Sequence, residues 1–176
     1  EIRDLEAAEI AIQASLTGHL VLSTLHTNDS ASALTRLVDM GVEPFLVSSS
    51  LAGVMAQRLV RVLCQNCKKP VTPDPRELAK VGLTPDDLDG NPVFEPVGCS
   101  ACLNTGYAGR TAIYEILNVN DKIRAMVLQN VDSGTIKSHA IENDGMETLR
   151  MDGAAKVKAG MTSIEEVLRV TQADFA

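Results

Sequence analysis

Aromatic side chains and positive charges are both scarce in this sequence of 176 residues. It contains no tryptophan, aromatic residues make up 3% of it, and 16 Lys and Arg stand against 23 Asp and Glu, for a net charge of −7. Surfaces that bind nucleic acids need clustered basic residues or rings that stack on bases. We therefore expect no nucleic-acid partner, and a core built from aliphatic side chains and methionine.

Long apolar runs are also lacking. No run of apolar residues approaches 18, so the sequence predicts no transmembrane segment. Its beginning does not have the pattern of a secretory leader. The sequence starts at Glu1 rather than at a methionine and enters an apolar helix pattern almost at once, which we interpret as a piece of a longer protein.

Hydrophobic periodicity and turn residues predict a mixed α/β chain. A buried strand is expected over residues 19–26, which are rich in Leu and Val, with further strands over 59–63 and 110–117. This order suggests half of an α/β unit followed by a small helical subdomain. The expected helices cover residues 5–16, 30–40, 44–58, 76–81, 121–129, 133–143, 146–159 and 163–171.

The four cysteines form two C-x-x-C pairs, Cys64 with Cys67 and Cys99 with Cys102. This spacing lets both sulfurs of a pair reach one ion from a tight turn, and two pairs supply the tetrahedral set of a structural zinc site. Disulfides are the alternative, but a chain of this size without a leader does not need them. A redox role for one pair would leave the other unexplained. We therefore expect a closed Zn²⁺ site with no catalytic position.

The cysteine pairs also predict how two strands meet. The first pair begins where the strand over 59–63 ends, and the second precedes the strand over 110–117. We expect these strands to lie side by side, as an antiparallel pair. Six of the seven prolines fall between residues 70 and 96, so the chain between the pairs is expected to leave the sheet as an excursion.

Two of the three histidines flank the predicted strand over 19–26. Because His19 and His26 are seven residues apart, they point to opposite faces and cannot share one metal ion. Thr24 and His26 share a face at the carboxyl end, the edge where open parallel sheets bind ligands. Spacing alone leaves a structural role for His26 open.

Four stretches together resemble a known family. They are EIRDLEAAEIAIQASLTGHLVLSTLHTND, MAQRLVRVLCQNCKK, GCSACLNTGYAGRTAIYEIL and GMETLRMDGAAKVKAGMTSIEEVLRVT, and they span the chain in order. The combination is similar to the type II secretion and type IV pilus assembly ATPases. The related pilus retraction ATPases lack the paired C-x-x-C motifs, so the resemblance is to an enzyme of secretion or pilus extension.

The resemblance implies an architecture. It predicts the C-terminal half of a RecA-like P-loop NTPase core, an inserted tetracysteine zinc-binding excursion and a C-terminal helical subdomain. Residues 1–63 would be the partial ATPase core, residues 64–109 the tetracysteine subdomain, and residues 110–176 the returning strand with the helical subdomain.

The resemblance also implies roles for single residues. Glu1 matches the Walker B glutamate, which helps to hold Mg²⁺ and polarises the attacking water. His26 matches the His-box histidine near the γ-phosphate, where it can stabilise developing charge. Thr24 and Arg3 are further candidates for contact with the nucleotide. His19 is expected to be structural.

The Walker A motif G-x-x-x-x-G-K-S/T does not occur in the sequence. We expect ATP and Mg²⁺ to bind in the whole protein and the chain alone to be inactive. By resemblance, the whole protein is a homo-hexameric, cytoplasmic ATPase, peripheral at the inner membrane, that works with a membrane platform and cytoplasmic adaptor proteins. No role is assigned to Arg58.

The alternative is a non-enzymatic, zinc-binding adaptor of a secretion machine. Its docking surface would be the acidic residues of the excursion, although such clusters commonly just face water. These residues are Asp74, Asp86, Asp87, Asp89 and Glu95.

Overall fold

A computed structural model describes residues 1–171 and divides into two compact units. The first unit contains residues 1–56 and 115–146, and the second contains residues 57–114 and those described from residue 147 onward. Helices and strands occur in both, so the predicted mixed α/β class is confirmed. No helix in the described part of the chain is long and apolar enough to span a membrane.

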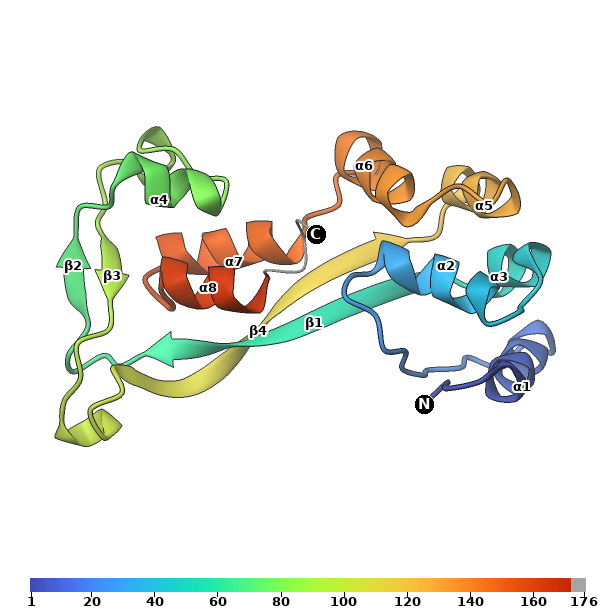
Figure 1. The fold of residues 1–176 in the computed structure, drawn as a ribbon, viewed down its shortest axis with the longest axis horizontal. Coiled ribbons are helices and arrows are strands. Elements are labelled where there is room, and N and C mark those ends of the chain that lie inside the picture. Colours follow the sequence, from blue (N-terminus) through green and yellow to red (C-terminus); the bar gives the residue numbers. More distant parts are fainter. Residues whose placement is uncertain (172–176) are drawn as a thin grey trace. The chain divides into compact units, whose positions relative to one another are not determined.

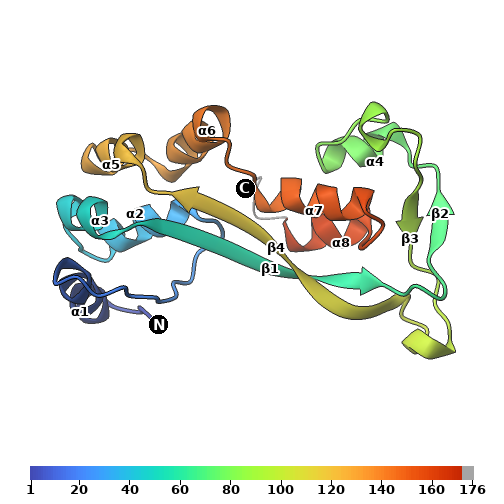
Figure 2. The ribbon, with the colours of Figure 1, turned by 180° about the vertical axis from the view of Figure 1, so that it is seen from behind.

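The longest strands, β1 (Gly53–Leu63) and β4 (Tyr107–Asn118), pair with each other. Their arrows point in opposite directions in Figures 1 and 2, so the predicted antiparallel pair is confirmed. Each strand begins in one unit and ends in the other. A Cβ atom on Gly53 would lie 3.1 Å from the Leu117 carbonyl oxygen, so the close approach of the two backbones favours glycine there.

The predicted helix over 44–58 is wrong in its second half. Helix α3 (Pro44–Ser50) ends early, and residues from Gly53 onward belong to β1. Pairing with β4 satisfies their backbone groups, and side-chain burial alternates along the first part of the strand as it does on a sheet. A sequence that suits both helix and strand forms the strand when a partner strand is available.

The first unit is mainly helical (Figure 1), and its buried apolar side chains form one core. Asp4 caps the first helix by accepting a hydrogen bond from the Ala7 N–H, and Asn120 and Asp132 cap two later ones in the same way. The helices besides α3 are α1 (Leu5–Leu16), α2 (Ala31–Asp39), α5 (Asp121–Leu128) and α6 (Ser133–Asp144). The core includes Leu34, Val47, Leu117, Ile123 and Ile136.

The predicted buried strand over 19–26 is wrong. Residues 19–27 form neither helix nor strand, and Leu20 and Leu22 are 85% and 88% exposed. A strand needs a partner for its backbone groups. Within residues 1–171, the backbone of residues 20–26 receives one hydrogen bond, from the Ile2 N–H to the Thr24 carbonyl oxygen at 2.9 Å.

The second unit contains the excursion, which is folded. Strands β2 (Lys69–Val71) and β3 (Val93–Glu95) pair antiparallel, and α4 (Pro75–Lys80) confirms the helix expected near residues 76–81. Helices α7 (Leu149–Lys158) and α8 (Ile164–Val170) belong to the same unit, and both Figures 1 and 2 show them as neighbours. One core joins excursion and helices through Leu78, Val81, Leu88, Val93, Ala154, Val157 and Val167.

A fully buried carboxylate ties β1 to α8. Glu166 accepts hydrogen bonds from the Arg61 N–H at 3.0 Å, the Arg61 guanidinium at 2.7 Å and the Arg169 guanidinium at 2.6 Å. Burial alone would raise the pKa of Glu166, but these donors outweigh it and lower the pKa to about 2. Thr162 adds a hydrogen bond to the Arg61 carbonyl oxygen at 2.8 Å, while Ser163 caps α8.

The buried carboxylate makes the second unit sensitive to acid. Because the folded pKa of Glu166 is about 2 and its ordinary value is 4.5, its ionisation stabilises the fold above about pH 4.5 and is lost as the pH falls toward 2. The difference in unfolding free energy between wild type and Glu166→Gln should therefore shrink over that range. Tyrosine fluorescence during urea unfolding measures it, since both tyrosines lie in the second unit. A difference that stays constant from neutral pH to pH 2 would contradict this prediction.

Candidate functional site

The four cysteine sulfurs lie together in the second unit. The Sγ atoms of Cys64 and Cys99 are 3.9 Å apart, and Cys102 is 3.8 Å from both Cys67 and Cys99. A disulfide would need about 2.05 Å, and all four thiols are free. Tetrahedral metal–sulfur bonds of about 2.3 Å place sulfurs about 3.8 Å apart. The cluster is therefore close enough, and correctly spaced, to hold a metal ion.

Tight turns at the ends of the long strands bring the two pairs together. The Cys64 N–H donates to the Gly106 carbonyl oxygen at 2.9 Å, which joins the end of β1 to the start of β4. Gly98 and Gly106 both have positive φ angles, of 112° and 77°. A Cβ atom on Gly106 would lie 2.4 Å from the Cβ atom of Pro96, so the second turn has no room for a side chain at position 106.

Backbone N–H groups point at the sulfurs. Gly98 donates to Cys67, and Cys99 and Gly106 donate to Cys102, at 3.2 to 3.3 Å. Burial alone would raise the pKa of the Cys102 thiol. The hydrogen bonds to its sulfur together outweigh burial and lower the pKa to about 6. Thiolates are the form in which cysteine binds metals. Burial and the neighbouring thiols raise the pKa of Cys67 to about 11 despite the bond from Gly98, so the turns place all four sulfurs but favour the thiolate only at Cys102.

A second cluster lies in the first unit, where Glu1 contacts two side chains. His26 Nε2 touches one carboxylate oxygen of Glu1, and the Arg3 guanidinium donates to the other at 2.6 Å. The hydrogen bond from Arg3 is the main cause that lowers the pKa of Glu1 to about 2, so this group is a carboxylate at neutral pH. The His26 side chain is 86% exposed, so it is not a core residue in the described part of the chain.

Thr24, His19 and Arg58 are the remaining residues that the sequence singled out. The Thr24 carbonyl oxygen accepts a hydrogen bond from the N–H of Ile2, the residue between Glu1 and its neighbour Arg3. His19 lies at the end of α1, with Nδ1 at 3.1 Å from the Thr17 hydroxyl. Arg58 belongs to the second unit.

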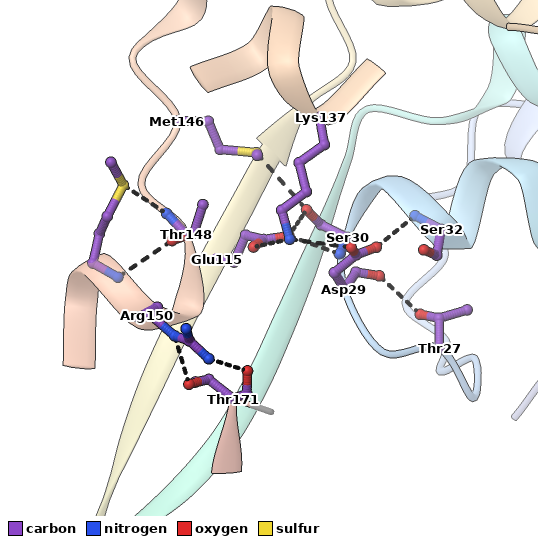
Figure 3. A network of polar contacts seen from close by, with 11 residues as sticks. Thr27, Asp29, Ser30, Ser32, Glu115, Lys137, Met146, Thr148, Arg150 and Thr171 are labelled. Carbon is purple, nitrogen blue, oxygen red and sulfur yellow. Dashed lines mark hydrogen bonds and ion pairs between the residues drawn. The ribbon is translucent and has the colours of Figure 1, made fainter. Parts of the chain in front are cut away.

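A buried ionic network that was not predicted from the sequence lies just after His26 (Figure 3). Glu115 on β4 accepts hydrogen bonds from the Ser30 N–H at 2.9 Å and the Ser30 hydroxyl at 2.6 Å. The Lys137 ammonium lies 3.2 Å from Glu115 and 3.1 Å from Asp29. A signal was present, since an acidic residue alternates with Ile113 and Leu117 on the buried face of β4.

Acidic residues of the excursion serve local structure. Asp74 accepts from the Arg76 N–H at the start of α4, and Asp87 accepts from the N–H and hydroxyl of Thr84, each at 2.7 to 2.8 Å. Two of the five acidic residues proposed as the docking surface of an adaptor therefore have a local structural role.

Comparison with known proteins decides the family. The sequence pattern of the family "Type II/IV secretion system protein" matches residues 1–169. The chain belongs to this family. It is 52% identical over 172 residues to the type II secretion system protein E of Pectobacterium carotovorum, covering 98% of the chain and 33% of that protein. It is 50% identical over 171 residues to the type IV pilus assembly ATPase PilB of Thermus thermophilus, covering 97% of the chain and 19% of that protein.

Solved structures show the same fold. The pilus retraction motor PilT with bound ADP aligns with 97% of the chain and 37% of its own, at a TM-score of 0.61 and 23% identity. The ATPase DotB of Legionella pneumophila aligns with 98% of the chain and 37% of its own, at a TM-score of 0.60 and 19% identity. The predicted family is thus confirmed, and the chain spans about a fifth to a third of the length of these curated relatives.

Metal removal should act on the second unit. The purified chain is expected to contain about one zinc per molecule, because a set of four cysteines fills a tetrahedral shell. Cys64→Ser or chelation should remove the zinc and expose residues 69–96 to protease, measured by metal analysis and limited proteolysis. Ser100→Ala is the matched control, since Ser100 is an exposed residue inside the second pair and should leave the zinc content unchanged. Absence of zinc from the wild-type chain would contradict the assignment.

Proposed function

We propose that this chain is the C-terminal part of an ATPase that powers type II protein secretion or type IV pilus assembly. In the whole protein, ATP and Mg²⁺ would bind to a RecA-like P-loop core, of which residues 1–63 form a part. Residues 64–109 would be the zinc-binding subdomain, and residues 110–176 the returning strand with a helical subdomain. Relatives named for both pathways support this proposal, at 50% and 52% identity.

The observation that carries the proposal is the contact between Glu1 and His26. These residues are 25 positions apart, and the family resemblance implies a separate role at the phosphates for each. Their side chains meet, and Arg3 holds the second oxygen of Glu1. A carboxylate next to an imidazole supplies what hydrolysis of a phosphoanhydride needs, a group that orients water and a donor for developing charge.

Residue roles follow from this arrangement. Glu1 would help to hold Mg²⁺ and orient the attacking water, and its low pKa keeps it ionised for that task. His26 would donate a hydrogen bond toward the γ-phosphate. Arg3 would keep the Glu1 carboxylate in place, and Thr24 would contact the nucleotide next to His26. The cysteines would hold a structural Zn²⁺ ion that takes no part in hydrolysis.

The exposed segment before His26 supports the view that further chain completes the site. Leu20 and Leu22 present apolar side chains to solvent from a segment that is neither helix nor strand, as expected where the neighbouring chain that would cover them is missing. The Walker A motif would come from that further chain, so residues 1–176 alone would not hydrolyse ATP. We further propose that the whole protein works as a cytoplasmic homo-hexamer, peripheral at the inner membrane, on a membrane platform and with cytoplasmic adaptors.

Replacement of one histidine tests the proposal in the whole protein. His26→Ala should lower ATP turnover by about 100-fold or more, because it removes a donor to transition-state charge. The measurement is steady-state release of phosphate at saturating ATP. His19→Ala is the matched control, since His19 lies on the same exposed segment and is bonded to the end of α1. Turnover at the wild-type rate in His26→Ala would refute the proposed site.

A further inference from the structure

The ionic network after His26 joins three parts of the first unit that are far apart in sequence. Glu115 comes from β4, Lys137 comes from α6, and Asp29 and Ser30 precede α2; Figure 3 shows their side chains pointing toward one another. Glu115 is fully buried, and the side chains of Lys137 and Asp29 are 16% and 17% exposed. All the members belong to one compact unit.

Each charge in the network has a defined partner. One oxygen of Glu115 accepts from the N–H and the hydroxyl of Ser30, and the other lies 3.2 Å from Lys137. Lys137 also contacts one oxygen of Asp29, whose other oxygen accepts from the Ser32 N–H at 2.8 Å. Ion pairs buried to this degree contribute little net stability compared with well-packed apolar residues. Their contribution here is therefore best sought in the geometry that they impose.

That geometry concerns a segment without regular secondary structure. Residues 19–27 have no helix or strand, whereas α2 begins at Ala31. The network holds Asp29 and Ser30, only three and four residues after His26. Thr27 adds a hydrogen bond from its hydroxyl to the Asp29 carbonyl oxygen at 3.0 Å. The backbone that carries His26 is thus fixed on its C-terminal side by Glu115 and Lys137.

We propose that Glu115 and Lys137 are positioning residues for His26. They fix the backbone of residues 29 and 30, and through it they set where the imidazole stands relative to Glu1. This inference rests on the proposed function, in which His26 acts at the γ-phosphate. A displacement of about 1 Å at a reacting centre can lower a rate about 100-fold, so loss of either residue should slow turnover without removing any group that touches nucleotide.

The test uses the whole ATPase and compares kcat and KM for ATP. Glu115→Gln and Lys137→Gln should each lower kcat by about 10-fold or more and leave KM within about twofold, because a transition-state contact is lost rather than substrate binding. Lys137→Arg keeps the charge and should recover most of the rate. Lys137→Gln carries the test if Glu115→Gln does not fold.

The matched control is Glu166→Gln. Glu166 is also fully buried, also accepts from a backbone N–H and also faces cationic side chains, but it lies in the second unit and holds β1 to α8. Its replacement should lower the unfolding temperature as Glu115→Gln does and leave kcat within about twofold. An equal loss of kcat in both variants, at equal loss of stability, would reduce Glu115 to a structural role and overturn the inference.

A double-mutant cycle identifies the residue through which Glu115 acts. In a His26→Gln background, Glu115→Gln should cause less than about a twofold further loss of kcat, whereas independent effects would multiply. Multiplying effects would overturn the inference. A slow His26→Gln beside a normal Glu115→Gln would refute the inference alone, and a His26→Gln enzyme with the wild-type rate would refute the proposed function as well.

Discussion

The pairing of β1 with β4 is the interaction on which the other features depend. It joins strands that are separated by the whole excursion, so its formation costs the entropy of closing a long loop. The Cys64 N–H bond to Gly106 continues the pairing to the point where the cysteine pairs meet. At the other end, the Val119 N–H donates to the Ala52 carbonyl oxygen at 3.0 Å. Between these ends, β4 carries Glu115 on its buried face.

Features with local signals could be predicted from the sequence. The C-x-x-C spacing and the strands beside it located the sulfur cluster, and apolar patterning between turn residues located α1 at the expected residues 5–16. Features decided by distant partners could not. Residues 53–58 have a composition that suits a helix, and only β4 makes them a strand. The three-residue strands β2 and β3 are too short for periodicity to reveal.

The site around His26 was predicted in part. The family resemblance pointed to Glu1 and His26, but their contact is a tertiary feature that residues 25 positions apart do not reveal in the sequence. The prediction of a strand over 19–26 was wrong because an apolar run indicates only that a segment is suited to burial. Whether it is buried depends on neighbours, and Leu20 and Leu22 have none among residues 1–171 that cover them.

The two buried glutamates show what a carboxylate can do that an apolar side chain cannot. Both are fully buried and both accept from a backbone N–H as well as from cations. Glu166 joins a strand to a helix, elements that backbone hydrogen bonds already order. Glu115 instead holds Ser30, next to a segment without regular structure. A leucine could fill that space, but it would leave the Ser30 N–H and the Lys137 ammonium without this acceptor. The carboxylate therefore determines the path of the chain as it leaves His26.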